Sequence, residues 1–106
     1  MRGSSTGRPI MALLDLLGRR WTLRVLWELR GEAPSFRALQ ARCHGMSSSV
    51  LSQRLAELRA AGIAAPAPDG GYALTGEGRA LLDALAPIDR WARRWADRQR
   101  PRARRG

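Results

Sequence analysis

The chain has 106 residues and a mass of 11.7 kDa, which suits a single domain. Hydrophobic residues make up 44% of the sequence, which is enough for a core and excludes a wholly disordered chain. Its 19 basic residues, all Arg, outnumber the nine acids and give a formal charge of +10, so the natural partner is a polyanion.

Helical periodicity dominates the first part of the chain. Apolar residues recur at three- and four-residue steps over residues 10–17, and Gly18 follows as a stop signal. A second helix is predicted over residues 21–29, after which Gly31 and Pro34 break the pattern. These two segments therefore predict a helical start to the domain.

Two further helices carry serines at the positions that cap a helix. Ser35 precedes a helix predicted over residues 36–42, and Ser47 precedes one predicted to reach about Ala61, where Gly62 follows as a terminator. The last of these helices has its apolar stripe at Leu51, Leu55 and Leu58. Three short helices followed by a well-capped fourth suggest a helical DNA-reading module.

The segment 63–74 changes character. Asp69-Gly70 between two short segments predicts a hairpin, and Pro66 and Pro68 limit its first arm to an edge strand. A long helix then begins near Thr75, with an apolar side made of Leu81, Leu82, Leu85, Ile88, Trp91 and Trp95. The predicted fold class is mainly α with a small β-wing.

The net charge is concentrated at the carboxyl end. Residues 98–106 contain five Arg and no acid, which is half of the net charge. Such a segment is too polar and too repulsive to pack, so we expect a disordered Arg-rich tail that either solubilises the chain or contacts phosphates. Residues 1–8 are expected to be a flexible N-terminal segment, and residues 9–97 the folded domain.

The ordered series of motifs resembles HxlR-type winged helix-turn-helix regulators of bacteria. The resemblance spans roughly residues 9–95. It is carried by Pro9-Ile10, Ala12-Leu13, the run from Leu16 to Leu23, Phe36-Arg37, Leu39-Gln40, Gly45-Met46-Ser47, the run from Val50 to Leu55, Glu57-Leu58, Gly62-Ile63, Tyr72, Leu74-Thr75, Gly78 and Trp91. It implies a dimeric transcription factor whose helix after the Gly-Met-Ser turn enters the major groove, with the first and last helices forming the dimer interface.

Two positions depart from the family pattern. Members often carry a Cys immediately before the Pro-Ile pair, used by some as a redox switch, whereas this chain has Arg8 there. The family wing is also longer and basic, while residues 64–71 hold one acid, Asp69, and no cation. A thiol sensor at that position is therefore excluded, and a wing that grips phosphate or the minor groove is doubtful.

Neutral residues form the candidate base-reading surface. On a helical wheel, Ser49, Ser52 and Gln53 lie opposite the leucine stripe, near the helix end that enters a major groove in helix-turn-helix docking. Gln can bond adenine bidentately and Ser can bond several base edges. Capping alone for the serines, and an ordinary solvated role for Gln53, stay open as alternatives.

Phosphate contacts are assigned to residues around that helix. Arg37 begins the helix that crosses the DNA backbone in this motif, and Ser48 lies beside unpaired backbone donors at a helix N-terminus. Arg54 is a third candidate, although it could instead pair with Glu57 or Glu28. Arg19, Arg20 and Arg42 are weaker candidates, with a solvated surface role equally open for the first two.

A dimer interface is predicted from apolar residues that a small domain cannot cover by itself. They are Ile10, Leu13, Leu14 and Leu17 in the first helix and Leu85, Ile88, Trp91 and Trp95 in the last. Burial of the last helix against the first within one chain is the alternative. The two tryptophans could also line a pocket for a small-molecule effector.

No enzyme is predicted, and no cofactor or metal. Cys43 and His44 are adjacent, so they seldom aim at one point, and a zinc site lacks ligands of suitable type and spacing. A redox role for an exposed Cys43 beside the DNA-reading helix is left open. A single Cys and a longest early apolar stretch of only eight residues, 10–17, favour a cytoplasmic protein without a membrane partner.

The sequence thus predicts a homodimeric regulator that binds double-stranded DNA at a palindromic operator. A non-specific or architectural nucleic-acid-binding protein is one alternative, which charge alone would drive. A protein-interaction module that retains the fold is another, favoured slightly by the neutral wing. The serine and glutamine surface favours the sequence-specific regulator.

Overall fold

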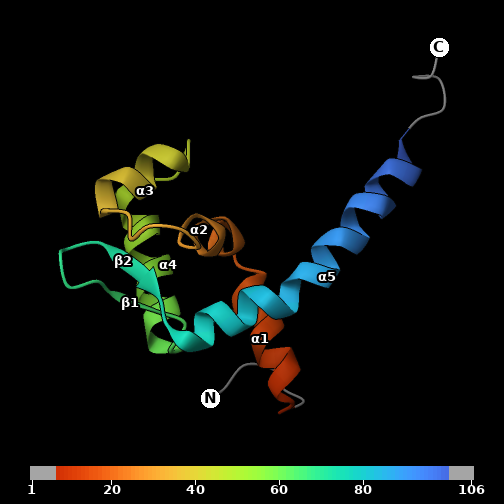
Figure 1. Cartoon of the computed structure of the whole chain (residues 1–106), viewed down its shortest axis with the longest axis horizontal. Helices are drawn as coiled ribbons and strands as arrows, with labels where there is room; N and C mark the ends of the chain where they lie inside the picture. Colours follow the sequence, from red (N-terminus) through yellow and green to blue (C-terminus); the bar gives the residue numbers. More distant parts are fainter. Residues whose placement is uncertain (1–6, 101–106) are drawn as a thin grey trace.

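The computed structural model describes residues 7–100, and five helices and a two-stranded sheet follow one another along this part of the chain (Figure 1). The elements are α1 (Pro9–Leu17), α2 (Thr22–Glu28), α3 (Phe36–Arg42), α4 (Ser48–Ala60), β1 (Ala64–Pro66), β2 (Tyr72–Leu74) and α5 (Gly76–Gln99). The mainly helical fold with a small wing is confirmed, and the helix limits differ from the predicted ones by one or two residues.

The serine and threonine caps form as the sequence predicts. The Ser35 hydroxyl accepts a hydrogen bond from the Ala38 amide at 3.1 Å, and the Ser47 hydroxyl accepts one from Val50 at 3.2 Å. Thr75 caps α5 by accepting from the Gly78 amide at 3.0 Å. Each cap satisfies an amide that the first helical turn leaves unpaired, so these residues fix where their helices begin.

The core lies between α2, α3, α4 and the wing. Its fully buried side chains include Leu26 of α2, Leu29 directly after α2, Leu39 of α3, and Leu51 and Leu58 of α4, all at 0% exposure. The leucine stripe predicted for α4 therefore packs inward. Because the stripe takes one side of the helix, its polar residues are left on the other side.

The wing is a two-stranded antiparallel hairpin tied to the body by backbone contacts. Ala64 pairs with Leu74 and Pro66 with Tyr72, and the Tyr72 amide donates to the Pro34 carbonyl at 2.9 Å. Gly71 lies so close to the α2–α3 connection that a Cβ there would meet the Ala33 oxygen at 2.5 Å. Only glycine fits at this crossing, and it sets where the wing leaves the domain.

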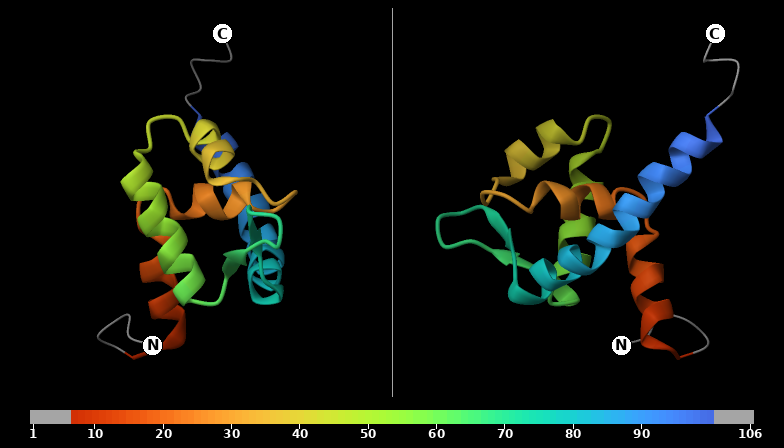
Figure 2. Two further views of the ribbon diagram at one scale, coloured as in Figure 1. Left: turned by 90° about the vertical axis from the view of Figure 1, so that its left-hand side faces the viewer. Right: turned by 45° about the vertical axis from the view of Figure 1, so that its right-hand side comes forward.

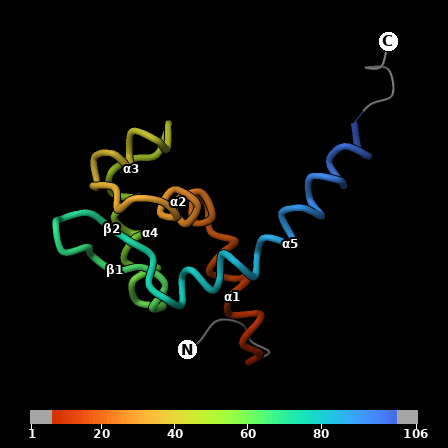
Figure 3. Tube along the Cα trace, in the orientation of Figure 1, coloured from red at the N-terminus to blue at the C-terminus, as the bar shows by residue number. Residues whose placement is uncertain are grey.

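The start of α5 is fixed and its far end projects. Leu81, Leu82 and Leu85 pack against the core, whereas the far end of the helix stands away from the body (Figures 1 and 3). The radius of gyration is 15.9 Å, above the about 13 Å expected of a compact domain this size. The shape is therefore that of a small body with a helical arm.

The predicted ends of the domain fall partly outside the described residues. Residues 1–6 and 101–106, which hold most of the expected N-terminal segment and tail, lie outside them. Arg98 and Gln99, assigned to the tail by sequence, belong to α5. None of the helices within residues 7–100 combines the length and the apolar character that a membrane crossing requires.

Candidate DNA-binding surface

A helix-turn-helix unit is formed by α3, the turn 43–47 and α4. Gly45 has a φ of +91°, a left-handed conformation that favours glycine, and Nε2 of the Gln40 side chain donates to the Met46 carbonyl at 3.3 Å across the turn. Cys43 and Met46 anchor the turn in the core at 1% and 4% exposure. The turn therefore holds α4 in a fixed direction relative to α3.

The exposed side of α4 carries the three predicted base-reading residues. Ser49, Ser52 and Gln53 are all exposed, while Leu51 and Leu55 on the other side are buried. One of the three has a second role, because the Ser49 and Ser47 hydroxyls hydrogen-bond at 3.3 Å beside the cap. The chain passes from the end of α4 directly into the hairpin (Figure 2), and Ser52 lines a hollow together with Tyr72 of the wing.

Two of the predicted phosphate-contact residues lie where they can reach a ligand. Arg37 and Ser48 are exposed in the first turns of α3 and α4. Within residues 7–100 no hydrogen bond or ion pair engages the Arg37 guanidinium. Its charge is thus available to a ligand.

Arg54 is placed differently, on the inner side of α4. Its side chain is only 13% exposed, and its Nη1 lies 2.5 Å from Oε1 of Glu57. The other carboxylate oxygen of Glu57 lies 3.1 Å from Nη1 of Arg19. Of the alternatives open in the sequence, pairing with Glu57 is the one that forms, and it leaves Arg54 and Arg19 poorly placed to contact phosphate.

The remaining arginines near the turn are also engaged. Arg24 and Arg42 share the carboxylate of Glu28, at 3.1 and 3.9 Å. The Arg20 guanidinium lies over the Trp21 ring, 5.6 Å from its centre. Four arginines therefore share two carboxylates, those of Glu57 and Glu28, and their guanidinium groups are engaged within the chain.

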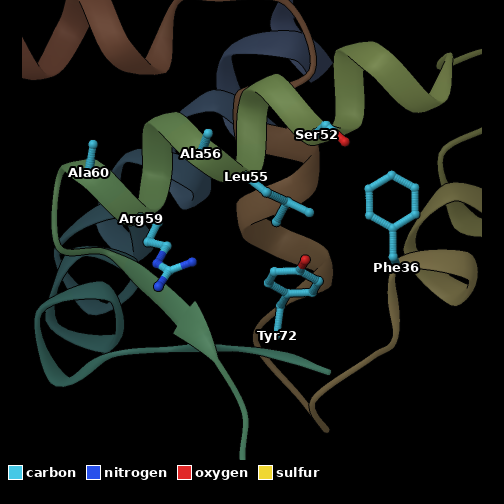
Figure 4. A pocket seen from close by; sticks show the side chains of 7 residues that line it. All are labelled: Phe36, Ser52, Leu55, Ala56, Arg59, Ala60 and Tyr72. Atoms are coloured by element: carbon cyan, nitrogen blue, oxygen red, sulfur yellow. The ribbon is translucent and has the colours of Figure 1, made fainter. Parts of the chain in front are cut away.

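The sequence reasoning missed Arg59 and Tyr72. With Phe36, Ser52, Leu55, Ala56 and Ala60 they line an open hollow of about 530 Å³ between α4 and the wing (Figure 4). Arg59 points from α4 toward the wing, and the Tyr72 hydroxyl points back toward α4. The spacing of Ser52 and Arg59 by seven residues, about two turns, was the available signal, because it puts both on one stripe.

Cys43 is buried, contrary to the exposed thiol that a redox role requires. Its exposure is 1%, and burial raises the pKa of the thiol above its usual value, although the Arg24 charge nearby acts to lower it. The raised pKa keeps Cys43 in the thiol form, which is a weaker nucleophile than the thiolate, so the site disfavours oxidation. Within residues 7–100, no three His, Cys, Asp or Glu residues gather where they could hold a metal ion.

The predicted dimer residues divide into exposed and buried ones. Ile10, Leu14, Ile88, Trp91 and Trp95 are 48–60% exposed, and the two tryptophan rings stack with centres 5.9 Å apart. Leu13 and Leu85 are half-buried against the core of the same chain.

Leu17 does not suit the role of a dimer contact. At 6% exposure it belongs to the core, because it faces the body at the end of α1 and leaves little surface for a partner.

A second open hollow lies between α1, α4 and the start of α5. Its volume is about 980 Å³. It is lined by apolar residues that include Leu13, Leu16 and Leu81, and by the charged residues Asp15, Arg19, Glu57 and Glu77. This mixture of apolar wall and charged groups is typical of a surface that a small molecule or another chain covers.

The chain folds into a helix-turn-helix unit followed by a hairpin, and its sequence matches a known family over most of its length. The HxlR-like helix-turn-helix family matches residues 16–100. This chain belongs to that family. Its fold is a winged helix-turn-helix, and the resemblance drawn from the motifs is confirmed.

Individual relatives agree with this assignment. An uncharacterized HTH-type transcriptional regulator of Bacillus subtilis, YvaP, is 32% identical over 90 residues, which cover 79% of this chain and 83% of YvaP. The quinone-bound structure of YodB from B. subtilis is 27% identical, with a TM-score of 0.75, and the match covers 82% of this chain and 98% of YodB.

A third relative is a solved structure of a possible HxlR family transcriptional factor from Thermoplasma volcanium GSS1. It is 26% identical with a TM-score of 0.71, and the match covers 87% of both chains. HxlR-like proteins are transcriptional regulators and not enzymes, so this chain is a DNA-binding transcriptional regulator.

Proposed function

We propose that this HxlR-like protein is a homodimer that regulates transcription in the cytoplasm by binding a palindromic operator. The observation that carries the proposal is the exposed side of α4, where Ser49, Ser52 and Gln53 lie together. All three offer hydrogen-bonding groups suited to base edges, and none adds a charge that would bind every sequence alike.

The proposed roles follow the placement of the side chains. Ser49, Ser52 and Gln53 contact bases in the major groove, while Arg37 and Ser48 contact phosphates that border it. Arg54 is withdrawn from the phosphate contacts because it pairs with Glu57. Phosphate contacts supply affinity and salt sensitivity, and the base contacts supply discrimination.

Dimerisation is proposed through α1 and α5. Ile88, Trp91 and Trp95 expose about half of their side chains on a helix that projects from the body, and Ile10 and Leu14 do so on α1. A second copy of the chain would bury these residues, and the twofold symmetry of the resulting dimer matches a palindromic site. Two copies of α4 would then meet one face of the DNA about one helical turn apart, or about 34 Å.

An effector site near the same surface is a further part of the proposal. The hollow of about 980 Å³ between α1, α4 and α5 supports it, although Trp91 and Trp95, the residues expected from the sequence, do not line it. YodB, which has the same fold, has a structure with quinone bound. The test is a melting curve of this protein with added benzoquinone. A raised melting temperature that Leu81→Arg abolishes supports the site, and an unchanged melting temperature contradicts a quinone as its ligand.

The deciding experiment is selection of bound fragments from a genomic library, followed by competition between the selected duplex and random duplex at fixed salt. A sequence-specific regulator prefers the selected duplex by at least about a thousandfold. Equal binding to both would favour a non-specific nucleic-acid-binding protein. Binding to neither would favour a protein-interaction module.

A further inference from the structure

The hollow between α4 and the wing holds a cation that nothing in the described chain neutralises. Arg59 is exposed, and no hydrogen bond or ion pair engages its guanidinium within residues 7–100. On the same helix, Arg54 is paired with Glu57. No acid is among the residues that line the hollow. Arg59 is therefore the cation that α4 leaves available on its outward side.

The position of Arg59 continues the candidate base-reading stripe. It follows Ser52 by seven residues, so the two side chains leave α4 in directions about 20° apart and lie about 10 Å apart along the helix. When the start of α4 contacts base edges, Arg59 therefore lies about 10 Å further along the same side of the helix, next to the wing.

The rest of the hollow suits a sugar–phosphate strand. The Tyr72 hydroxyl points into it from β2, and the Ser52 hydroxyl lies at its other end (Figure 4). Phe36, Leu55, Ala56 and Ala60 supply apolar walls of the kind that a deoxyribose ring can contact. The Arg59 guanidinium, the Tyr72 hydroxyl and the apolar walls match the chemistry of a nucleic-acid backbone, while Ser52 stays with the base-reading residues.

The wing itself offers no cation for this purpose. Residues 64–71 contain one acid and no Arg, and Pro66, Pro68 and Asp69 are exposed on the hairpin. A cation that binds a phosphate near the hairpin must therefore come from a neighbouring element. Arg59 can provide it because its side chain points from α4 toward the hairpin.

We propose that Arg59 and Tyr72 bind a phosphate of the DNA strand that passes between α4 and the wing, so that α4 supplies the cation that the hairpin lacks. The inference rests on the proposed function in taking duplex DNA as the ligand. Arg59 also has an alternative role that needs no ligand, because a cation in the last turn of a helix interacts favourably with the helix dipole.

The test compares how DNA affinity depends on salt in four variants of the full chain. Arg59→Ala is expected to weaken binding about tenfold on selected and random duplex alike, and to lower the slope of log affinity against log salt by about 1. Arg59→Lys keeps the charge and is expected to restore the slope. Tyr72→Phe removes only a neutral hydroxyl, so it weakens binding without changing the slope.

Arg90→Ala is the matched control. Arg90 is exposed on α5, has no ion pair or hydrogen bond within residues 7–100, and leaves the helix about 200° away from Ile88. Like Arg59→Ala, the substitution Arg90→Ala removes one positive charge, but at a position away from the proposed DNA-binding and dimer surfaces. It is expected to leave the DNA affinity and its salt slope unchanged. If it reproduces the effect of Arg59→Ala, net charge is the cause and the proposal fails.

The remaining outcomes separate this inference from the proposed function. A lower melting temperature of Arg59→Ala with an unchanged salt slope assigns Arg59 to the helix dipole and overturns the inference. If the wild-type chain still selects an operator in that case, the proposed function stands. If the wild-type chain binds no duplex, both fail.

Discussion

Arg54 and Glu57 form an ion pair on the inner side of α4, with 2.5 Å between the guanidinium and the carboxylate. Only 13% of the Arg54 side chain and 19% of the Glu57 side chain are exposed, and Arg19 binds the second oxygen of the carboxylate at 3.1 Å. The Nε atom of Arg54 is buried and has no partner among the described residues. The pair therefore joins α4 to the α1–α2 connection and is not part of the outward surface.

Replacement of Arg54 is expected to affect folding and not DNA binding. Exposed pairs contribute about 0–1 kcal/mol and breaking a buried one costs about 3–5 kcal/mol, so Arg54→Ala should lower the free energy of unfolding by about 2 kcal/mol. Urea denaturation measures this loss, and a double-mutant cycle with Glu57→Gln tests whether it belongs to the pair. A lower salt slope of DNA binding with unchanged stability would restore Arg54 as a phosphate contact.

The start of α5 is predicted to tolerate no side chain at Gly78. A Cβ there would lie 2.2 Å from the Ile63 carbonyl oxygen. That oxygen already accepts hydrogen bonds from the Thr75 amide and hydroxyl. Because backbone must move to admit the methyl group, Gly78→Ala should cost about 1–3 kcal/mol. Denaturation in urea or by heat measures it.

Gly76 provides the matched control for Gly78. It lies in the same turn, has an ordinary φ, and a Cβ there would meet nothing within 4 Å. Gly76→Ala should therefore stabilise the protein by about 0.4–1 kcal/mol, because alanine costs less conformational entropy on folding. Equal effects of the two substitutions would contradict the close approach of Gly78 to Ile63.

Local signals explain why so much of the fold could be predicted from the sequence. Ser35, Ser47 and Thr75 act on amides three residues away, and the leucine stripe of α4 repeats within a single helix, so neither requires knowledge of distant residues. The helix-turn-helix unit and the exposed Ser52 and Gln53 follow from these signals.

Contacts between distant segments explain what the sequence could not reveal. The sequence leaves Arg54 open between phosphate and an acid, and it does not indicate that Arg19 binds the same Glu57 carboxylate from another element. Leu17 is buried because the end of α1 faces the body. The hollow near Arg59 depends on Tyr72, thirteen residues further along and on a strand placed by Gly71. Spacing within a helix carries no information about such neighbours.

The exposed tryptophans of α5 give the test of dimerisation. Trp91 and Trp95 are 51% and 48% exposed and stack on each other, so a partner that covers them gains a large rigid apolar surface. Trp91→Ala is expected to raise the dimer dissociation constant at least about thirtyfold, as loss of a hot-spot residue of about 2 kcal/mol implies. Sedimentation equilibrium measures it.

Arg90→Ala should leave the dimer intact in the same measurement, since it changes the other side of α5. Trp27 is a second control, because it is 45% exposed on α2, away from the proposed interface, with Arg30 over its ring at 3.9 Å. If Trp27→Ala dissociates the dimer and Trp91→Ala does not, the interface lies on α2 and not on α5.

Gln53 is expected to discriminate between bases without contributing to binding of random DNA. Its side chain is exposed beside Ser49 and Ser52, and a bidentate contact to adenine is worth about 1–3 kcal/mol of discrimination. Gln53→Ala should therefore weaken binding to the selected operator by that amount and relax one base preference, with affinity for random duplex and the salt slope unchanged. Competition binding with single-base operator variants measures both effects.

Arg37→Ala is the contrasting variant, because loss of a phosphate contact weakens all sequences alike and lowers the slope by about 1. Equal losses for Gln53→Ala on operator and random duplex would remove Gln53 from the base-reading residues.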